Sequence, residues 1–179
     1  LQVYSTLAHE KIGFEPLVAG KVSMYVCGMT VYDRCHIGHG RSMVVFDMVA
    51  RYLRYLGYDV SYVRNITDVD DKIIARALKN DETIESLTER CIDAMHEDER
   101  ALLNISPDEE PRATVHMSAM IQMIEHLVAA GHAYVADNGD VYFEVARFET
   151  YGGLLRQDVE SLRAGARVDV VSAKRDPLD

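Results

Sequence analysis

The sequence predicts an α/β protein whose first half is built on a parallel sheet and whose second half is a mixed α+β segment. Three patterns predict the sheet. Residues 21–27 alternate between apolar and polar side chains, as in a strand. Apolar residues then recur at helical spacing from about residue 37 to residue 56, and a second strand pattern spans residues 60–66. Strand, helix and strand in this order form a βαβ unit, whose two strands run parallel.

The elements of the first half have recognisable faces and ends. Val22, Met24 and Val26 lie on one apolar face of the first strand. Gly57 fits the position that ends the helix, because glycine adopts a left-handed backbone without strain. The carboxyl ends of the two parallel strands should lie at the same edge of the sheet, which is where open α/β sheets bind ligands.

The next part of the sequence predicts a helix and a linker. A helical pattern spans residues 83–103. Its predicted inward face consists of Leu87, Cys91, Met95 and Leu102. Residues 105–111 are acidic and contain proline, so they indicate a linker. We therefore expect residues 1–110 to form the first domain and residues 111–179 to form the insertion.

The last part predicts another helix and a β-hairpin. The helix should begin after Thr114 and end at Gly131. Its predicted inward face consists of Met117, Ile121, Ile124 and Val128. Asn138 and Gly139 stand between two apolar runs, which is a strong signal for a tight hairpin. A helix followed by a hairpin departs from the βαβ pattern, so this segment should be a separate unit.

Composition and charge exclude several classes of protein. The 179 residues are 48% hydrophobic, enough for a globular core, but no uncharged stretch approaches the ~20 residues of a membrane span. We therefore expect no membrane partner. Three cysteines without a CxxC pair favour free thiols in a reducing, cytoplasmic compartment. The net charge is −10, yet residues 1–80 carry ten Lys and Arg against eight Asp and Glu, so a phosphate-rich ligand should favour the first half.

The loop after the first strand carries the clearest candidate site. The start of the following helix offers free N–H groups and a positive dipole end, which together suit an anion. Gly38 and Gly40 would let a ligand approach the backbone closely. His36 and His39 share one face of the first turn and could donate hydrogen bonds to phosphate oxygens. The alternative is that both histidines only cap or fill the start of the helix.

A metal site is a competing interpretation of the same loop. Cys27, Cys35, His36 and His39 could form a Cys₂His₂ zinc site, although their spacing departs from that of known zinc sites. Cys27 alone could supply one ligand of a site completed from elsewhere. Judged by spacing alone, Cys27 is more simply a buried thiol at the end of a strand.

A polar cluster follows the second strand and should face the same crevice. Asp68, Asp70 and Asp71 could hold Mg²⁺. The simpler interpretation is that Thr67 or Asp68 caps the next helix and that the acidic residues suit its positive end. Asn65 and Thr67 are then the better candidates for ligand contact.

Longer strings around these residues resemble a known family. The segment CHIGHGRS contains the tetrapeptide HIGH, is preceded by YVCG and is followed by NITDVDDKI. Together with PRAT, GHAYVADNGDVYFEV, YGGLLRQD and GARVDVV, these strings closely resemble the N-terminal part of bacterial cysteinyl-tRNA synthetases, which are class I aminoacyl-tRNA synthetases. The resemblance extends over essentially the whole chain.

The resemblance implies a fold and an activity. The fold would be a Rossmann catalytic domain interrupted from about residue 111 by a connective-peptide insertion. The activity would be that of a cysteine–tRNA ligase, which uses ATP with Mg²⁺ to convert L-cysteine into cysteinyl-adenylate and transfers the cysteine to tRNA(Cys). AMP and pyrophosphate are released. The resemblance also implies a monomer with one zinc ion.

The resemblance further implies roles for individual residues. Cys27 would be a zinc ligand, and the zinc would also bind the thiolate of the substrate cysteine, which rejects serine because zinc prefers sulfur. His36 and His39 would be catalytic, stabilising the α-phosphate as pyrophosphate leaves. The implied ATP site consists of Thr30, His36, Gly38 and His39. The implied amino-acid site consists of Cys27, Gly28, Asn65 and Thr67.

One departure from the family is large. Family members continue with three further zinc ligands, the second half of the nucleotide fold, a KMSKS loop and an anticodon-binding domain, and this sequence contains no KMSKS-like string. We therefore expect an N-terminal fragment that does not aminoacylate alone and binds zinc weakly. Two alternatives remain open: a cysteine-activating ligase that acts on an amino-sugar, as in mycothiol synthesis, and a non-catalytic module that binds a nucleotide or a metal.

Overall fold

The computed structural model describes residues 1–155 and 173–179. The chain divides into two compact units. One is Pro16–Met117, and the other combines Leu1–Glu15 with Ser118–Asp179. The predicted division into residues 1–110 and 111–179 remains a prediction. The motif GARVDVV and the end of YGGLLRQD lie outside the described residues.

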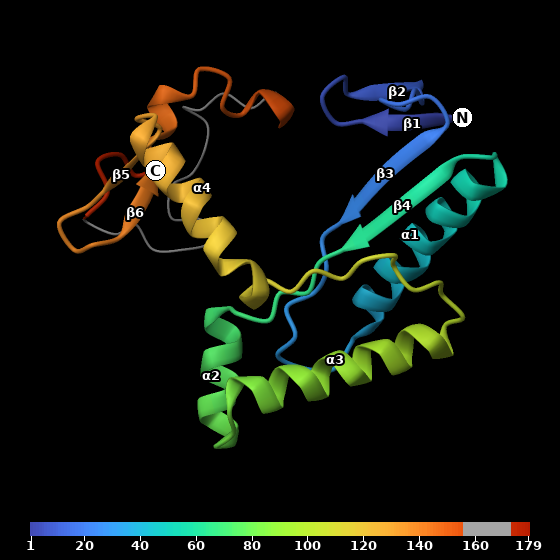
Figure 1. The fold of residues 1–179 in the computed structure, drawn as a ribbon, viewed down its shortest axis with the longest axis horizontal. Helices are drawn as coiled ribbons and strands as arrows, with labels where there is room; N and C mark the ends of the chain where they lie inside the picture. The colour runs from blue at the N-terminus through green and yellow to red at the C-terminus, as the bar shows by residue number, and fades with distance from the viewer. Residues whose placement is uncertain (156–172) are drawn as a thin grey trace. The chain divides into compact units, whose positions relative to one another are not determined.

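The unit Pro16–Met117 contains the predicted βαβ arrangement. Strand β3 (Lys21–Val26) pairs in parallel with β4 (Asp59–Arg64), and helix α1 (Ile37–Tyr55) connects them. Figure 1 shows the two strands side by side with α1 beside them. The register places Val22 opposite Val60. Gly57 follows the end of α1 with a φ of +90°, which confirms its predicted role.

The backbone pairing between β3 and β4 continues beyond the ends of the two strands. Thr30 and Thr67 form a parallel bridge, so the chain segments after β3 and β4 continue side by side. On the other side of β4, Ile66 donates its N–H to the carbonyl oxygen of Pro111 at 2.9 Å. Residues 109–113 therefore act as a short third strand. Residues 105–111 connect α3 (Ile84–Ala101) to η1 (Thr114–His116), as a linker does, and the end of this segment pairs its backbone with the open hydrogen-bonding edge of β4.

Two further helices complete this unit. Helix α2 (Asp71–Asn80) begins after Asp70, whose carboxylate accepts the N–H of Lys72 at 2.9 Å. The prediction that Thr67 or Asp68 caps this helix is wrong: Thr67 lies in the bridge to Thr30, and Asp68 is buried and bonded to Thr114. Helix α3 (Ile84–Ala101) begins after Thr83, whose hydroxyl accepts the N–H of Ser86.

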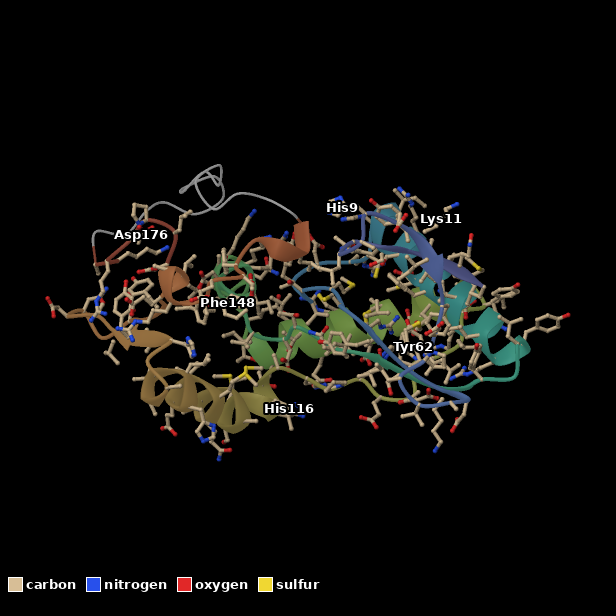
Figure 2. The ribbon with its side chains drawn as sticks, turned by 90° about the horizontal axis from the view of Figure 1, so that it is seen from above. His9, Lys11, Tyr62, His116, Phe148 and Asp176 are labelled. Carbon is tan, nitrogen blue, oxygen red and sulfur yellow. The ribbon has the colours of Figure 1, made fainter. Side chains whose placement is uncertain are left out.

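Apolar side chains from the strand ends and all three helices form the core. The larger cluster consists of Val31, Met43, Ile66, Ile73, Ala77, Leu87, Cys91, Ile92 and Met95. A second cluster joins Val26, Ala50 and Tyr62; Tyr62, labelled in Figure 2, is only 1% exposed. The predicted inward face of α3 is confirmed for three of its four residues. Leu102 is 45% exposed because the helix has already ended there.

The described part of the other unit contains two antiparallel strand pairs. Strands β1 (Gln2–Ser5) and β2 (Glu10–Gly13) form one pair, and β5 (Ala133–Val135) and β6 (Val141–Phe143) form the other. Gly139 has a φ of +88° in the turn between β5 and β6, which confirms the predicted hairpin. Short 3₁₀ turns η2 (Val145–Arg147) and η3 (Gly153–Leu155) follow.

Helix α4 (Met117–Ala129) follows the 3₁₀ turn η1 (Thr114–His116) and is followed by Gly131 at a φ of +76°. The prediction of a buried face on α4 is wrong, because Met117, Ile121 and Ile124 are each more than 40% exposed. The spacing of apolar residues determines which side chains share a face but not whether another element covers it. Among the described residues, no helix has the length and apolar character needed to cross a membrane.

The packing of α2 gives a first testable expectation. Replacing Ile73 by Ala should lower the free energy of unfolding by about 2–5 kcal/mol, because Ile73 is fully buried and its loss leaves a cavity. Leu78 lies on the same helix but is 78% exposed, so Leu78→Ala should cost less than about 0.5 kcal/mol. Urea unfolding followed by circular dichroism measures both. Equal losses would contradict this packing of α2.

Candidate functional site

A cavity of about 170 Å³ lies at the carboxyl ends of β3 and β4. The end of β3, the first turns of α1, strand β4 and helix α3 all contribute to its wall. The lining residues are Val26, Cys27, Gly28, Met29, His39, Ser42, Met43, Phe46, Tyr62, Arg64 and Met95. The two strand ends therefore face one crevice, as the βαβ pattern predicted. Cys27, Gly28 and His39 are the predicted site residues that line it.

Cys27 is an exposed free thiol at the mouth of this crevice. It follows Val26, the last residue of β3, which points into the core and is 5% exposed. Because successive residues of an extended chain point to opposite sides, Cys27 points away from that core. The prediction of a buried strand thiol is therefore wrong, and Cys27 is accessible to a ligand or a metal.

Gly28 is held against β4 by the tightest contact of the site. Its N–H donates to the side-chain oxygen of Asn65 at 2.8 Å. A Cβ atom at Gly28 would lie only 1.7 Å from the carbonyl oxygen of Asn65, so no side chain fits. The amide of Asn65 in turn donates to the hydroxyl of Thr67 at 3.2 Å. The structure thus brings together three of the residues predicted for the amino-acid site.

Thr30 lies next to this group through backbone pairing. The N–H of Val31 donates to the carbonyl oxygen of Thr67 at 3.1 Å, and Thr30 is the bridge partner of Thr67. Thr30 was predicted for the ATP site, and the structure places it beside a residue predicted for the amino-acid site. Thr30 and Thr67 are not among the residues that line the cavity, so they flank it.

His36 and His39 cap the start of α1. The backbone N–H of Gly38 donates to Nδ1 of His36 at 3.0 Å, and the backbone N–H of His36 donates to Nδ1 of His39 at 3.3 Å. Their rings stack with centroids 3.8 Å apart. The capping interpretation is therefore correct as far as Nδ1 is concerned, since these reciprocal bonds satisfy N–H groups that the first turn leaves free.

Capping also determines where each ring carries its proton. A backbone N–H can only donate, so both Nδ1 atoms must be unprotonated acceptors, and each neutral ring then carries its proton on Nε2. Burial lowers the pKa of His39, and the neighbouring His36 lowers it further, which favours the neutral form. Within residues 1–155 and 173–179 neither Nε2–H group is used in a hydrogen bond, so both can donate to an acceptor. Capping and ligand binding, first considered as alternatives, therefore use different nitrogens.

The loop does not form the four-ligand metal site that the sequence left open. Among residues 1–155 and 173–179, the one group of three or more His, Cys, Asp or Glu side chains with closely spaced ligand atoms is His96, Glu99 and Glu110. Cys35 packs against the larger core cluster, with Sγ 3.4 Å from Sδ of Met29. Burial, with a contribution from Asp98, raises the pKa of Cys35 to about 11.

The acidic residues after β4 also do not gather into a Mg²⁺ site. Asp68 is 4% exposed and accepts both the N–H and the hydroxyl of Thr114, at 2.9 Å and 2.5 Å. Asp70 caps α2, and Asp71 lies in its first turn, where a carboxylate suits the positive end of the helix. Each carboxylate therefore has its own structural role.

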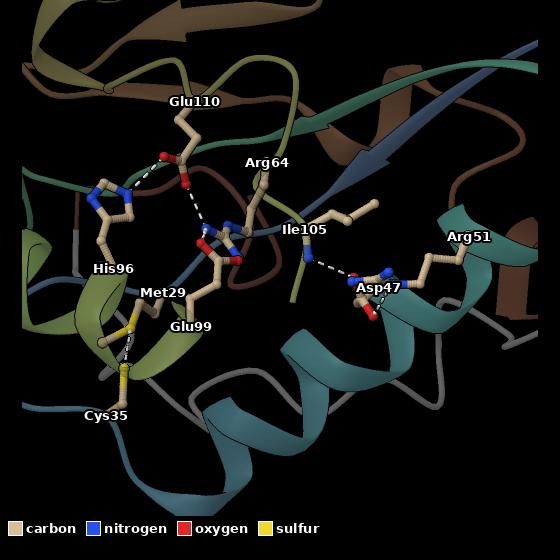
Figure 3. A network of polar contacts seen from close by, with 9 residues as sticks. All are labelled: Met29, Cys35, Asp47, Arg51, Arg64, His96, Glu99, Ile105 and Glu110. Atoms are coloured by element: carbon tan, nitrogen blue, oxygen red, sulfur yellow. Dashed lines mark hydrogen bonds and ion pairs between the residues drawn. The ribbon is translucent and has the colours of Figure 1, made fainter. Parts of the chain in front are cut away.

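Sequence reasoning missed one group beside the cavity, which Figure 3 shows. The guanidinium of Arg64 contacts the carboxylates of Glu99 and Glu110, and His96 contacts Glu110. The signal was present in β4, where alternation places Arg64 on the same side as the buried Val60 and Tyr62. Because both carboxylates already bind the guanidinium of Arg64, and Glu110 also contacts His96, we interpret the group as an ion-pair network and not as a metal site.

The close contact at Gly28 can be tested with a matched pair of substitutions. Gly28→Ala should destabilise the protein by roughly 1–3 kcal/mol or more, because the methyl group would overlap the backbone of Asn65. Gly40→Ala is the control: its Cβ would first meet Leu102 at an ordinary 3.5 Å. Urea midpoints measure both. Equal stability of the two variants would show that β3 and β4 do not approach as described.

The cysteines should differ in reactivity because of their surroundings. The thiol of Cys35 stays protonated well below its raised pKa of about 11, whereas Cys27 is exposed. At pH 7 we expect iodoacetamide to modify Cys27 at least about tenfold faster than Cys35, because the thiolate is the nucleophile. Raising the pH to 9 should increase the Cys35 rate about 100-fold, since its thiolate fraction rises tenfold per pH unit. Peptide mass spectrometry measures both rates; equal rates at pH 7 would contradict this assignment.

Comparisons with known proteins agree with the fold and with the motifs. The sequence profile described as tRNA synthetases class I (C) catalytic domain matches residues 13–179. Cysteine–tRNA ligases from Vibrio vulnificus and Chromohalobacter salexigens are 61% and 59% identical over all 179 residues. The chain spans 39% of the length of each.

A solved structure supports the same conclusion at the level of the fold. Mycobacterium tuberculosis methionyl-tRNA synthetase, in complex with methionyl-adenylate, superposes with a TM-score of 0.56 at 25% identity. The match covers 68% of this chain and 26% of that one. These findings confirm the predicted Rossmann-like α/β class and the resemblance drawn from the motifs. The chain belongs to the family of class I (C) tRNA synthetase catalytic domains.

Proposed function

We propose that this chain supplies the amino-acid site and part of the ATP site of a cysteine–tRNA ligase. Such an enzyme forms cysteinyl-adenylate from L-cysteine and ATP and transfers the cysteine to tRNA(Cys), releasing pyrophosphate and AMP. The observation that carries the proposal is the 61% identity with a cysteine–tRNA ligase over the full length of the chain. The arrangement around the cavity supports this proposal. Cys27, at the end of β3, could recognise a thiol, and the histidines at the start of α1 could bind phosphate.

The amino-acid half of the site would consist of Cys27, Gly28, Asn65 and Thr67. Zinc fits this half, since Cys27 is an accessible thiol at the end of a strand and thiolates are preferred zinc ligands. Cys27 would be one protein ligand, and a bound zinc would supply a coordination position that prefers the thiolate of cysteine over the hydroxyl of serine. Gly28 keeps the backbone open beside that position, because no side chain projects from it.

The ATP half would consist of Thr30, His36, Gly38 and His39. The start of α1 carries the positive end of its dipole, and the two Nε2–H groups can donate to phosphate oxygens. Donors that are fixed before the substrate binds stabilise charge that grows on the α-phosphate as pyrophosphate leaves. The stacked imidazoles would therefore act as hydrogen-bond donors through Nε2 and not as proton-transfer groups. Mg²⁺ would enter with ATP.

Charge and thiol chemistry point to the wider setting of the chain. Residues 81–179 carry nine Lys and Arg against twenty-one Asp and Glu, so the main tRNA surface should not lie there. The three free cysteines suit a reducing cytoplasm. We propose a monomer, as the family resemblance implies.

A chimaera tests the two half-sites. This chain would replace the matching segment of the Vibrio vulnificus cysteine–tRNA ligase, with which it is 61% identical. We expect Cys27→Ser to lower both zinc content and cysteine-dependent ATP–pyrophosphate exchange by at least ~10-fold, because it removes a metal ligand. His39→Ala should slow exchange by about 10²–10³-fold, the effect of losing one such donor, while zinc content stays the same.

The controls separate the two roles. Cys35→Ser should leave zinc content and exchange unchanged, because the Cys35 thiol packs against the core. Unchanged exchange in Cys27→Ser would refute the ligand role of Cys27. Loss of zinc in His39→Ala would instead favour a metal site within the loop. A parent chimaera with no cysteine-dependent exchange would refute the proposed function.

A further inference from the structure

Arg64 is the centre of a buried network at the carboxyl end of β4 (Figure 3). Its Nη1 lies 2.6 Å from Oε1 of Glu99, and its Nη2 lies 3.1 Å from Oε2, so the two side chains form a bidentate pair. Nη2 also donates to Glu110 at 2.5 Å. The Arg64 side chain is 5% exposed and that of Glu99 is 4% exposed. A planar guanidinium bound in this way has one orientation.

The network joins three parts of the chain. Glu99 belongs to α3, and Glu110 belongs to the extended segment after it. The backbone also links β4 to this extended segment, since the N–H of Arg64 donates to the carbonyl oxygen of Glu109 at 3.0 Å. Both the main chain and the side chain of Arg64 are therefore fixed to the segment that borders β4. On the far side of Glu110, Nε2 of His96 lies 2.7 Å from its second carboxylate oxygen.

Arg64 also adjoins the proposed amino-acid site. Asn65, the next residue, holds the N–H of Gly28 with its side chain and excludes any side chain there with its carbonyl group. The Cγ of Arg64 lies 3.6 Å from the point that a Cβ on Gly28 would occupy. Arg64 lines the same cavity as Cys27 and Gly28.

We propose that Arg64 is a positioning residue for the amino-acid half of the site, acting with Glu99 and Glu110. The network fixes the end of β4 so that Asn65 holds Gly28, and hence Cys27, at the edge of the cavity. The inference rests on the proposed function for the identity of the substrate, but the contact between Asn65 and Gly28 can be measured without it.

Physical chemistry favours positioning over stability as the role of this network. Buried ion pairs contribute little net stability, because removing charges from water offsets their attraction, and apolar replacements of the whole group are often as stable. Their geometric demands are strict, however, since each carboxylate must meet the guanidinium at a fixed angle. Small displacements of substrate-positioning groups are costly to catalysis.

The first experiment measures KM values in the chimaera described above. Arg64→Lys keeps the charge but loses the bidentate pair with Glu99. We therefore expect KM for cysteine in ATP–pyrophosphate exchange to rise about tenfold or more. KM for ATP should stay within about twofold, because His36, Gly38 and His39 of the ATP half lie at the start of α1 and not at the end of β4. Arg76→Lys is the matched control: Arg76 forms an exposed pair with Asp33, and neither KM should change.

The second experiment uses the chain itself and needs no catalysis. In Arg64→Met combined with Glu99→Leu and Glu110→Gln, no buried charge of the network is left unpaired, so the variant should fold. Amide hydrogen exchange measured by NMR should show that Gly28 loses protection at least about tenfold, since its bond to Asn65 loosens. The amide of Leu56, bonded to Tyr52, is the control and should keep its protection.

The outcomes distinguish the two proposals. Unchanged protection of Gly28 together with an unchanged KM for cysteine would overturn the role of Arg64, even if stability or the amount of active enzyme fell. Loss of Gly28 protection in this variant supports positioning whether or not the parent chimaera has activity. Absence of cysteine-dependent exchange in the parent refutes the proposed function alone.

Discussion

The absence of a side chain at Gly28 allows the ends of β3 and β4 to meet. The carbonyl oxygen of Asn65 lies where a Cβ would stand, and the Asn65 amide group binds the Gly28 N–H in the same place. From this contact the two chain segments continue together to the bridge between Thr30 and Thr67. Cys27 and Gly28 line the cavity beside this contact, and Asn65 and Thr67 follow from it along the other chain segment.

The first turn of α1 shows how one pair of residues can serve both the fold and a ligand. His36 and His39 complete the hydrogen bonds of the helix start with their Nδ1 atoms. Because those atoms can then only accept, the opposite nitrogens carry the protons and remain available as donors. The cap therefore prepares the rings for phosphate before any phosphate is present, at the end of the helix whose dipole already attracts an anion.

Several parts of the fold could be predicted because their signals are local. The alternation in β3, the glycines after α1 and α4 and the Asn138-Gly139 turn each depend on the conformational preference of one or two residues. The errors concern the segments that cover a face or an edge, and the residue at which a helix ends. The apolar face of α4 is exposed, Leu102 lies just past the end of its helix, and the pairing of residues 109–113 along β4 was not predicted. Periodicity contains no information about which segment covers a face or an edge.

The sequence by itself determined the family, the βαβ order and the residues that can bind a ligand or a metal: Cys27, His36, His39, Asn65 and Thr67. Only the tertiary structure decided which atoms of those residues are in use. It joined Arg64 to Glu99 and Glu110, which lie 35 and 46 residues away along the chain. It also exposed Cys27 and directed the histidine Nδ1 atoms to the backbone. The physical reason is that burial and hydrogen-bond partners depend on distances between segments, which are fixed only when the chain has packed.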